Sequence, residues 1–284
     1  MIHYLIAVNR LERNKQKLVL SMLLEGSSIR ATARTVGCHK KTVSDLSKMA
    51  GRVAARYQDQ QLRNLDLERI QLDEIWSFLY AKQKNLPKLK QPRVAGDLWT
   101  WIAFCPDTKL VAVWRIGDRT AETAVDFLAD LENRLADRIQ LTTDGYSAYL
   151  EAVEAAFGGE VDYAMLSKVA SREELEIRKQ VIFGDPDKDH ISTSLIERQN
   201  LTLRMSSRRY TRKTNAFSKK MENHALAVAL HFLHYNFVRI HSTIRMTPAM
   251  AAGVTDRLYD LDWILDMVDE AWPKPKRPKI YRRK

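Results

Sequence analysis

The chain has 284 residues, and its 46 lysines and arginines against 35 aspartates and glutamates give a formal net charge of +11. That length suffices for one substantial core and a smaller module, and the positive surplus favours a polyanionic partner, most simply nucleic acid. Cys38 and Cys105 form no CxxC pair, which argues against a cysteine zinc site, and no apolar run approaches the roughly 20 residues of a membrane helix.

The positive charge is concentrated in three stretches that are poor in acids: residues 1–50, residues 198–220 and the tail at 273–284. A solubilising surface would explain any one of them, but the three together favour contact with phosphates. The two lone thiols fit a reducing cytosol, and the first eight residues do not form a convincing signal peptide. We therefore expect a cytoplasmic protein with no membrane partner.

The first fifty residues have the spacing of a helix-turn-helix. Residues 17–24 and 29–36 are helical in pattern, Ser27 or Ser28 can cap the second helix, and Gly37 supplies the turn before a third. The third helix begins with a polar, basic turn, as DNA-reading helices do. The side chains expected to face DNA are His39, Lys40, Lys41, Thr42 and Ser44. A plain three-helix bundle is the alternative. Residues 51–66 are expected to be a polar helical linker.

From residue 69 the pattern changes to strands. Strands are expected at residues 69–80, 98–105, 110–116, 138–144 and 161–166, and helices at 121–136, at 146–157, from Ser194 and at 217–239. Residues 172–188 are poorly patterned and are expected to form a loop. The short turns between the first three strands indicate an antiparallel meander. The helix at 121–136 then connects the third strand to the fourth by a βαβ-type crossover.

That order of elements is the ribonuclease H-like arrangement. We predict an α/β fold whose ribonuclease H-like mixed sheet and flanking helices occupy residues 66–244. An all-α helix-turn-helix domain with its linker precedes it over residues 1–62, and a C-terminal helical segment with the basic tail follows over residues 245–284.

Three acids, Asp73, Asp144 and Glu197, are candidates for one metal site. In the ribonuclease H-like order the first and fourth strands are parallel neighbours, so Asp73 and Asp144 are expected to approach each other under the helix that carries Glu197. A carboxylate inside a strand is costly unless it is paired or bound to a metal. Two strand carboxylates and a helical one therefore indicate an oxygen-ligand site for divalent cations.

Each acid also has an ordinary structural explanation. Side chains alternate across a strand, so Asp73 and Glu74 are expected on opposite faces, and only one of them is expected to join Asp144. From the local sequence alone, Asp73 and Glu74 are nearly equal candidates for the acid that joins Asp144. Asp144 can be a turn aspartate before Gly145, and Glu197 can complete a capping box with Ser194.

A row of donors continues past Glu197 on the same helix. Asn200 and Arg204 follow it by three and seven residues and share its face, and Arg208 extends the row. These groups can donate hydrogen bonds to the oxygens of a phosphodiester. The alternative is that they only form a solvated basic face of the helix. The role of His190 stays open, and His231 and His234 are expected to be buried structural histidines.

The sequence resembles the DDE transposases of the insertion sequence 1 type, over nearly its whole length. The matching stretches are Asp73-Glu74-Ile75-Trp76-Ser77-Phe78, then residues 96–101, 117–124, 141–146, 190–194, 197–200, 214–220, 235–241 and 246–250. The resemblance implies that Asp73, Asp144 and Glu197 are the catalytic and metal-binding acids, and it selects Asp73 over Glu74. It also implies that Arg204 is the basic residue seven positions after the glutamate.

The resemblance further implies Mg²⁺ as the cofactor, with Mn²⁺ as an alternative, and double-stranded DNA, as terminal inverted repeats and as target, for the substrate. Two ends must be cut and joined, so we expect a homodimer or a higher oligomer on DNA, associated with a bacterial nucleoid. Two other classes of protein remain open. One is a ribonuclease H-like nuclease or resolvase without strand transfer, and the other is an inactive or domesticated helix-turn-helix regulator.

Overall fold

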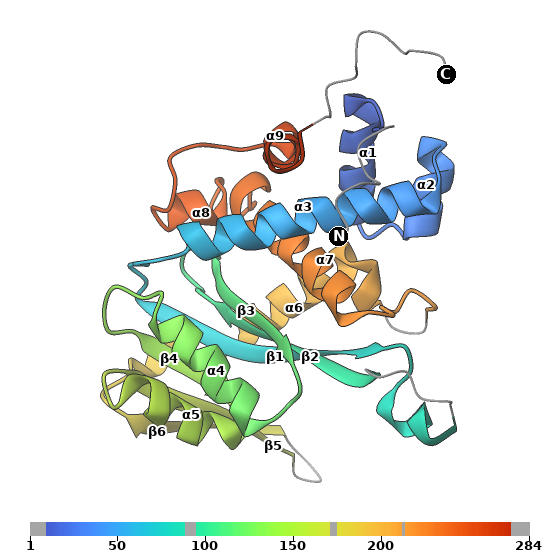
Figure 1. Ribbon diagram of the computed structural model, residues 1–284. Coiled ribbons are helices and arrows are strands. Elements are labelled where there is room, and N and C mark those ends of the chain that lie inside the picture. Colours follow the sequence, from blue (N-terminus) through green and yellow to red (C-terminus); the bar gives the residue numbers. More distant parts are fainter. Residues whose placement is uncertain (1–9, 89–94, 171–174, 212–213, 274–284) are drawn as a thin grey trace, which may run out of the picture.

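The computed structural model of the chain describes residues 10–88, 95–170, 175–211 and 214–273, and most of the predicted basic tail lies outside these ranges. The described chain forms a helical part stacked on a part built around a β-sheet (Figure 1). Among the described residues, no helix is both long and apolar enough to cross a membrane.

The described chain opens with the helix-turn-helix that the sequence predicted. Its helices are α1 (Arg13–Leu24), α2 (Ile29–Val36) and α3 (Lys40–Gln61). Ser28 caps α2 by accepting the Ala31 N–H at 3.1 Å, and Gly37 ends it in the left-handed region at a φ of 69°. His39 caps α3, because its Nδ1 accepts the Lys41 N–H at 3.2 Å.

The second half of α3 is not the polar linker that we predicted. α3 continues without a break to Gln61 and packs against α7 (Met221–Leu233), so that Val53 and Ala54 are buried. Gln58 is buried as well and donates from Nε2 to the Ala229 carbonyl at 2.9 Å. The prediction failed because small residues and one glutamine form the contact, and their pattern resembles that of a solvated helix.

Gly51 marks the point where α3 crosses α7. A Cβ atom added there would lie 2.3 Å from the Leu226 carbonyl oxygen. We therefore expect Gly51→Ala to lower the free energy of unfolding by about 1–3 kcal/mol, through overpacking. Urea denaturation followed by circular dichroism measures this, with Arg56→Ala on the exposed face of α3 as the control. Equal stability of the two variants would show that the helices do not meet this closely.

The sheet has six strands in the order β3-β2-β1-β4-β5-β6. The strands are β1 (Arg69–Leu79), β2 (Gly96–Phe104), β3 (Val111–Gly117), β4 (Gln140–Asp144), β5 (Asp162–Ala170) and β6 (Leu175–Phe183). β1, β2 and β3 pair antiparallel, whereas β4 is parallel to both β1 and β5. α4 (Ala121–Glu132) makes the crossover from β3 to β4, and α5 (Ala148–Phe157) joins β4 to β5. This topology confirms the predicted ribonuclease H-like mixed sheet.

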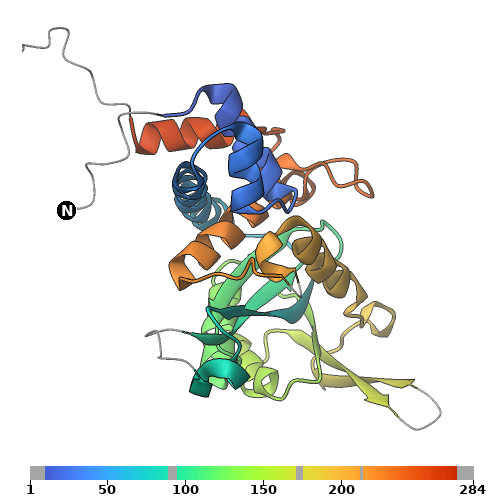
Figure 2. The same cartoon turned by 90° about the vertical axis from the view of Figure 1, so that its right-hand side faces the viewer.

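The sixth strand corrects the loop predicted for residues 172–188. β6 pairs antiparallel with β5, and the two strands extend from the sheet as a hairpin (Figure 2). β6 lies at the edge, where it carries charged residues and leaves Ile177 and Val181 exposed. Edge strands often carry charges, which obscure the apolar alternation that identifies a strand in a sequence.

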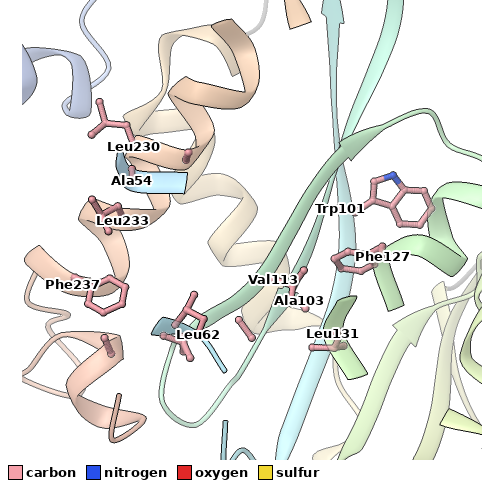
Figure 3. Packing of buried hydrophobic residues seen from close by; sticks show 14 of the residues in the cluster. Ala54, Leu62, Trp101, Ala103, Val113, Phe127, Leu131, Leu230, Leu233 and Phe237 are labelled. Atoms are coloured by element: carbon pink, nitrogen blue, oxygen red, sulfur yellow. The ribbon is translucent and has the colours of Figure 1, made fainter. Parts of the chain in front are cut away.

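Helices cover both faces of the sheet. On one face Trp101 of β2 meets Phe127 of α4 and Tyr149 of α5, with ring centroids 5.9 and 5.7 Å apart. On the other face Ile75 of β1 belongs to a second buried cluster with residues of α6 (Ser194–Ser206) and α7. Figure 3 shows the first cluster continuing past Leu62 to side chains of α7, so the helix-turn-helix and the sheet share one hydrophobic core.

The C-terminal helices pack against the N-terminal ones. After α7 the chain makes a π-helical turn (His234–Val238) and forms α8 (Pro248–Ala251) and α9 (Leu261–Ala271). Arg13 of α1 forms ion pairs with Asp262 of α9 at 2.9 Å and with Asp269 at 3.1 Å. α7 begins at Met221, four residues after the start expected from the sequence.

Candidate active site

The two strand acids lie at corresponding positions of neighbouring parallel strands. β1 and β4 pair through Gln71 opposite Thr142. Two more residues in the same direction lead to Asp73 on β1 and to Asp144, the last residue of β4. Because side chains alternate along a strand, two steps return both acids to the face of Gln71 and Thr142. The predicted approach of Asp73 and Asp144 thus follows from the observed register.

Asp73 is held by two hydrogen bonds. Its Oδ1 accepts the Glu74 backbone N–H at 2.8 Å, and its Oδ2 accepts Asn200 Nδ2 of α6 at 2.7 Å. The pKa of Asp73 is raised to about 6, mainly by burial and also by the nearby charges of Asp144 and Glu197, while the two hydrogen bonds oppose the rise. Three carboxylates from three elements therefore influence one another electrostatically.

Glu74 joins the acids, contrary to our expectation that only one first-strand residue would reach Asp144. Among the described residues, one carboxylate oxygen each from Asp73, Glu74 and Asp144 lie within 4.8 Å of one another. The pairing of β1 with β4 ends at Gln71, so beyond it the edge of β1 is open toward Asp144. Two side chains that leave opposite faces of β1 can therefore both reach this gap.

The Glu74 side chain is only 1 % exposed. Its pKa is raised to about 7, mainly by burial and also by the charges of Asp144 and Asp73, while Tyr149 and Arg119 oppose the rise. The Tyr149 hydroxyl lies beside the carboxylate without reaching hydrogen-bond geometry, and Glu74 Oε1 has no hydrogen-bond partner among the described residues. A buried oxygen of this kind has capacity for another ligand.

Arg119 supplies a positive charge that the sequence did not reveal. It pairs with Glu74 Oε2 at 3.2 Å and reaches Asp144 Oδ2 at 3.9 Å. Its guanidinium lies 4.0 Å from the ring centroid of Tyr146 and 5.1 Å from that of Trp99. Arg119 was not among the residues predicted for this site from the sequence. Its position two residues after β3, in a stretch matching the family, was the available signal.

Glu197 lies in the first turn of α6 and is exposed. Its Oε1 accepts the Thr193 hydroxyl at 3.2 Å, so Thr193, and not the predicted Ser194, is its partner at the helix start. Glu197 is outside the 4.8 Å group, although its charge contributes to the raised pKa of Asp73. Asn200, one turn later, contacts Asp73 directly and leaves its own Oδ1 without a hydrogen-bond partner among the described residues.

The other candidate residues lie farther along α6 or in the helix-turn-helix. Arg204 is half-buried on α6, and Arg208 is exposed just after it. In α3 the exposed Lys41 pairs with Asp45 at 2.7 Å, and Lys40 is exposed while Thr42 and Ser44 are half-buried. His190 pairs with Asp187 at 2.7 Å. The structure thus gathers Asp73, Asp144 and Asn200, and it places the α3 residues in a separate region.

The donor atoms of the acid group fit a divalent cation. Carboxylate oxygens are the ligands that Mg²⁺ and Mn²⁺ prefer, and three of them converge within 4.8 Å. Burial raises the pKa values of Asp73 and Glu74, and the neighbouring carboxylates add to the rise, so ionising these groups without a nearby positive charge is unfavourable. Arg119 offsets only part of the negative charge. The residues present therefore match an oxygen-ligand metal site.

The sequence match to a known protein decides the family. The chain is 30% identical over 158 residues to the insertion element iso-IS1n protein InsB of Shigella dysenteriae. The matched residues make up 54% of this chain and 86% of that protein. The chain belongs to the insertion sequence 1 family of DDE transposases. The stretches around Asp73, Asp144 and Glu197 that resemble the family lie on or next to β1, β4 and α6.

Two further comparisons add little to this assignment. No family model matches the chain. A chain of the simian T-cell lymphotropic virus intasome, in complex with the PP2A regulatory subunit B56 gamma, has a TM-score of 0.41 and 17% sequence identity. The similarity covers 78% of this family member and 62% of that chain. The fold class rests instead on the strand order and the directions of pairing.

The raised pKa values predict a coupling between pH, metal and stability. Between about pH 4 and 7, Asp73 and Glu74 keep their protons in the folded chain, whereas in the unfolded chain they are ionised. The free energy of unfolding therefore falls as the pH rises through this range, by up to about 3 kcal/mol for each group. His224, His231 and His234 act in the opposite direction, because burial lowers the pKa of each. The acids must therefore be isolated by comparison with a variant.

We expect an Asp73→Asn, Glu74→Gln double variant in EDTA to gain stability relative to the wild type as pH rises from 5 to 7.5. Millimolar Mg²⁺ should stabilise the wild type more at pH 7.5 than at pH 5, and the variant hardly at all. Urea denaturation at both pH values, with and without Mg²⁺, measures the differences. A constant difference between wild type and variant, with no gain in Mg²⁺, would contradict the raised pKa values.

Proposed function

We propose that the chain is a DNA transposase that cleaves the ends of an insertion sequence and joins them to target DNA by two-metal phosphoryl transfer. The observation that supports this most strongly is the meeting of Asp73 and Asp144 just beyond the point where the parallel strands β1 and β4 stop pairing, with α6 joined to Asp73 through Asn200. That arrangement occurs in a member of the insertion sequence 1 family. The net charge of +11 suits a DNA substrate.

In this proposal Asp73, Asp144 and Glu197 hold the metal ions, Mg²⁺ or Mn²⁺. When bound, such ions activate water and offset the charge that develops on the phosphate. Asn200 orients Asp73 through the 2.7 Å hydrogen bond to its Oδ2. Arg119 keeps Glu74 and Asp144 partly neutralised through its ion pairs. Glu197, exposed at the start of α6, approaches the strand acids when the site is filled.

Two successive displacements at phosphorus make up the proposed reaction. Water attacks the phosphate at each element end, the bond to the 3′ oxygen breaks, and a 3′-hydroxyl is left on the element. That hydroxyl then attacks a target phosphodiester, a new phosphorus–oxygen bond forms, and the target's own 3′ oxygen leaves. The family member needs one site for both steps, because each is an in-line displacement at a phosphodiester.

The DNA contacts are divided between two parts of the chain. We assign recognition of the terminal inverted repeats to residues 1–62, through His39, Lys40, Lys41, Thr42 and Ser44 at the start of α3. Residues 66–244 form the catalytic domain, in which Arg204 and Arg208 contact phosphates, and residues 245–284 are the C-terminal helical segment and basic tail. Two ends require at least a homodimer on DNA, in the cytoplasm of a bacterium and on its nucleoid.

A strand-transfer assay tests this function. The substrate is a duplex that carries the terminal repeat flanking the coding region, already cut to expose the 3′-hydroxyl, together with supercoiled plasmid and Mg²⁺. We expect joined product. Cleavage of an uncut end without joining of the pre-cut end would indicate a nuclease or resolvase. Sequence-specific binding with neither reaction would indicate a regulator.

A further inference from the structure

A groove of about 950 Å³ lies between the helix-turn-helix and the C-terminal end of α6. One wall is the beginning of α2 and the first turns of α3. The other walls are the end of α6, the short 3₁₀ helix Arg208–Tyr210 with residues that follow it, and one face of α7. The groove is distinct from the acid site, because none of Asp73, Glu74, Asp144 or Glu197 lines it.

The described residues that line the groove are strongly basic. The cations are Arg30, Lys40, Lys41, Lys48, Arg208, Arg209 and Lys219. Asp45 is the one acid among those lining residues, and Lys41 and Lys48 both pair with it at 2.7 Å. The remaining cations of the groove have no acid of their own among the lining residues. Such a groove attracts a polyanion.

Arg209 is a cation of the groove whose guanidinium is largely desolvated. Its Nη1 donates to the buried Ser218 hydroxyl at 2.7 Å, and that hydroxyl is in turn joined to His224 Nδ1 at 2.9 Å. No described carboxylate forms an ion pair with Arg209, and burial lowers its pKa. A desolvated guanidinium without an acidic partner is costly, and a phosphate on the groove side would offset that cost.

The two walls of the groove are fixed relative to each other. A Cβ atom on Gly26, before α2, would lie 2.6 Å from the Met205 carbonyl oxygen at the end of α6. Farther along α3, Arg52 pairs with Glu222 of α7 at 2.6 Å. Because the helix-turn-helix is docked on the catalytic part at both places, a ligand in the groove contacts both parts of the same chain at once.

We propose that this groove binds the phosphate backbone of the DNA end, with Arg209 as a phosphate anchor. The inference rests on the proposed function for the identity of the DNA. It adds that the bound DNA runs along this groove from the helix-turn-helix toward the acid site. Along α6, Ser206 lies nine residue steps after Glu197, which is about 14 Å at 1.5 Å per residue. At 3.4 Å per phosphate along one strand, the groove would hold phosphates roughly four base pairs from the scissile bond.

The salt dependence of DNA binding tests the groove. A 20-base-pair duplex is titrated in EDTA, without chemistry, at several salt concentrations against the wild type, Arg209→Gln, Lys219→Gln and Lys84→Gln. Lys84 is an exposed lysine outside the groove and serves as the matched control. Each lost phosphate contact should reduce the slope of log affinity against log salt by about 0.9, which weakens binding about fivefold at 0.15 M salt.

We expect this loss for both groove variants and not for Lys84→Gln. Lys219 is exposed, so its substitution tests the groove even where Arg209→Gln lowers stability. Unchanged slopes for both groove variants, or an equal loss in the control, would overturn the proposal. The outcome is separable from the proposed function, because the slopes are measured without metal. A chain that joins DNA with unchanged slopes would refute the groove alone, and altered slopes without joining would refute transposition alone.

Discussion

Asp144→Asn is expected to abolish both end cleavage and strand transfer, and Asp73→Asn is expected to do the same. We expect at least about a thousandfold loss, equivalent to about 4 kcal/mol of transition-state stabilisation. The physical reason is that an amide replaces a carboxylate oxygen at the position where β1 and β4 bring the two acids together. Cleavage and joining of a labelled terminal-repeat duplex in Mg²⁺ measure the loss.

Glu154→Gln on the exposed face of α5 is the matched control, and it should retain full activity. Circular dichroism shows whether each variant keeps its fold. Removing the charge of Asp73 or Asp144 relieves repulsion within the metal-free acid group, so neither variant should be less stable in EDTA. Activity that survives Asp144→Asn unchanged would contradict a role of this acid in the chemistry.

Glu197→Gln and Glu74→Gln are expected to differ in a way that identifies the third acid. The proposed site uses Glu197, so its amide variant should lose cleavage by about a thousandfold, whereas Glu74→Gln should stay within about tenfold of wild type. The reason is that Glu74 is buried and already paired with Arg119, while Glu197 is exposed at the start of α6. Both variants are assayed on the same cleavage substrate.

The reverse result has a clear structural meaning. Loss of cleavage in Glu74→Gln with activity in Glu197→Gln would make Asp73, Glu74 and Asp144 the metal ligands, as their 4.8 Å grouping permits. A second readout separates the two assignments without catalysis. Mg²⁺ should stabilise Glu74→Gln about as much as wild type and Glu197→Gln less, if Glu197 is a ligand.

The meeting of Asp73 and Asp144 could be predicted from the sequence because it depends on the order of elements. Three strands in a meander, a crossover helix and a fourth strand leave few arrangements, and the observed register places both acids at its end. The helix-turn-helix was likewise predictable, because its caps at Ser28 and Gly37 are local signals.

Contacts between distant elements could not be predicted in this way. Strand alternation places Asp73 and Glu74 on opposite faces, but it does not tell where β4 stops pairing with β1 and opens the edge. Arg119 reaches the acids from the loop after β3, and although its stretch matches the family, the spacing of its sequence neighbours does not indicate contact with Glu74 and Asp144. The second half of α3 was misjudged for a related reason, since Gly51 and Ala54 are interior only because α7 lies against them.

The most direct test of the central claim is the position of a metal ion in the protein bound to a pre-cut end. Anomalous diffraction from Mn²⁺ in crystals of that complex locates the ion and its ligands without reference to activity. We predict manganese between Asp73 and Asp144, with Glu197 turned in from α6 to coordinate it. Manganese bound by Asp73, Glu74 and Asp144 with Glu197 left in solvent, or no manganese at these acids, would contradict the proposed site.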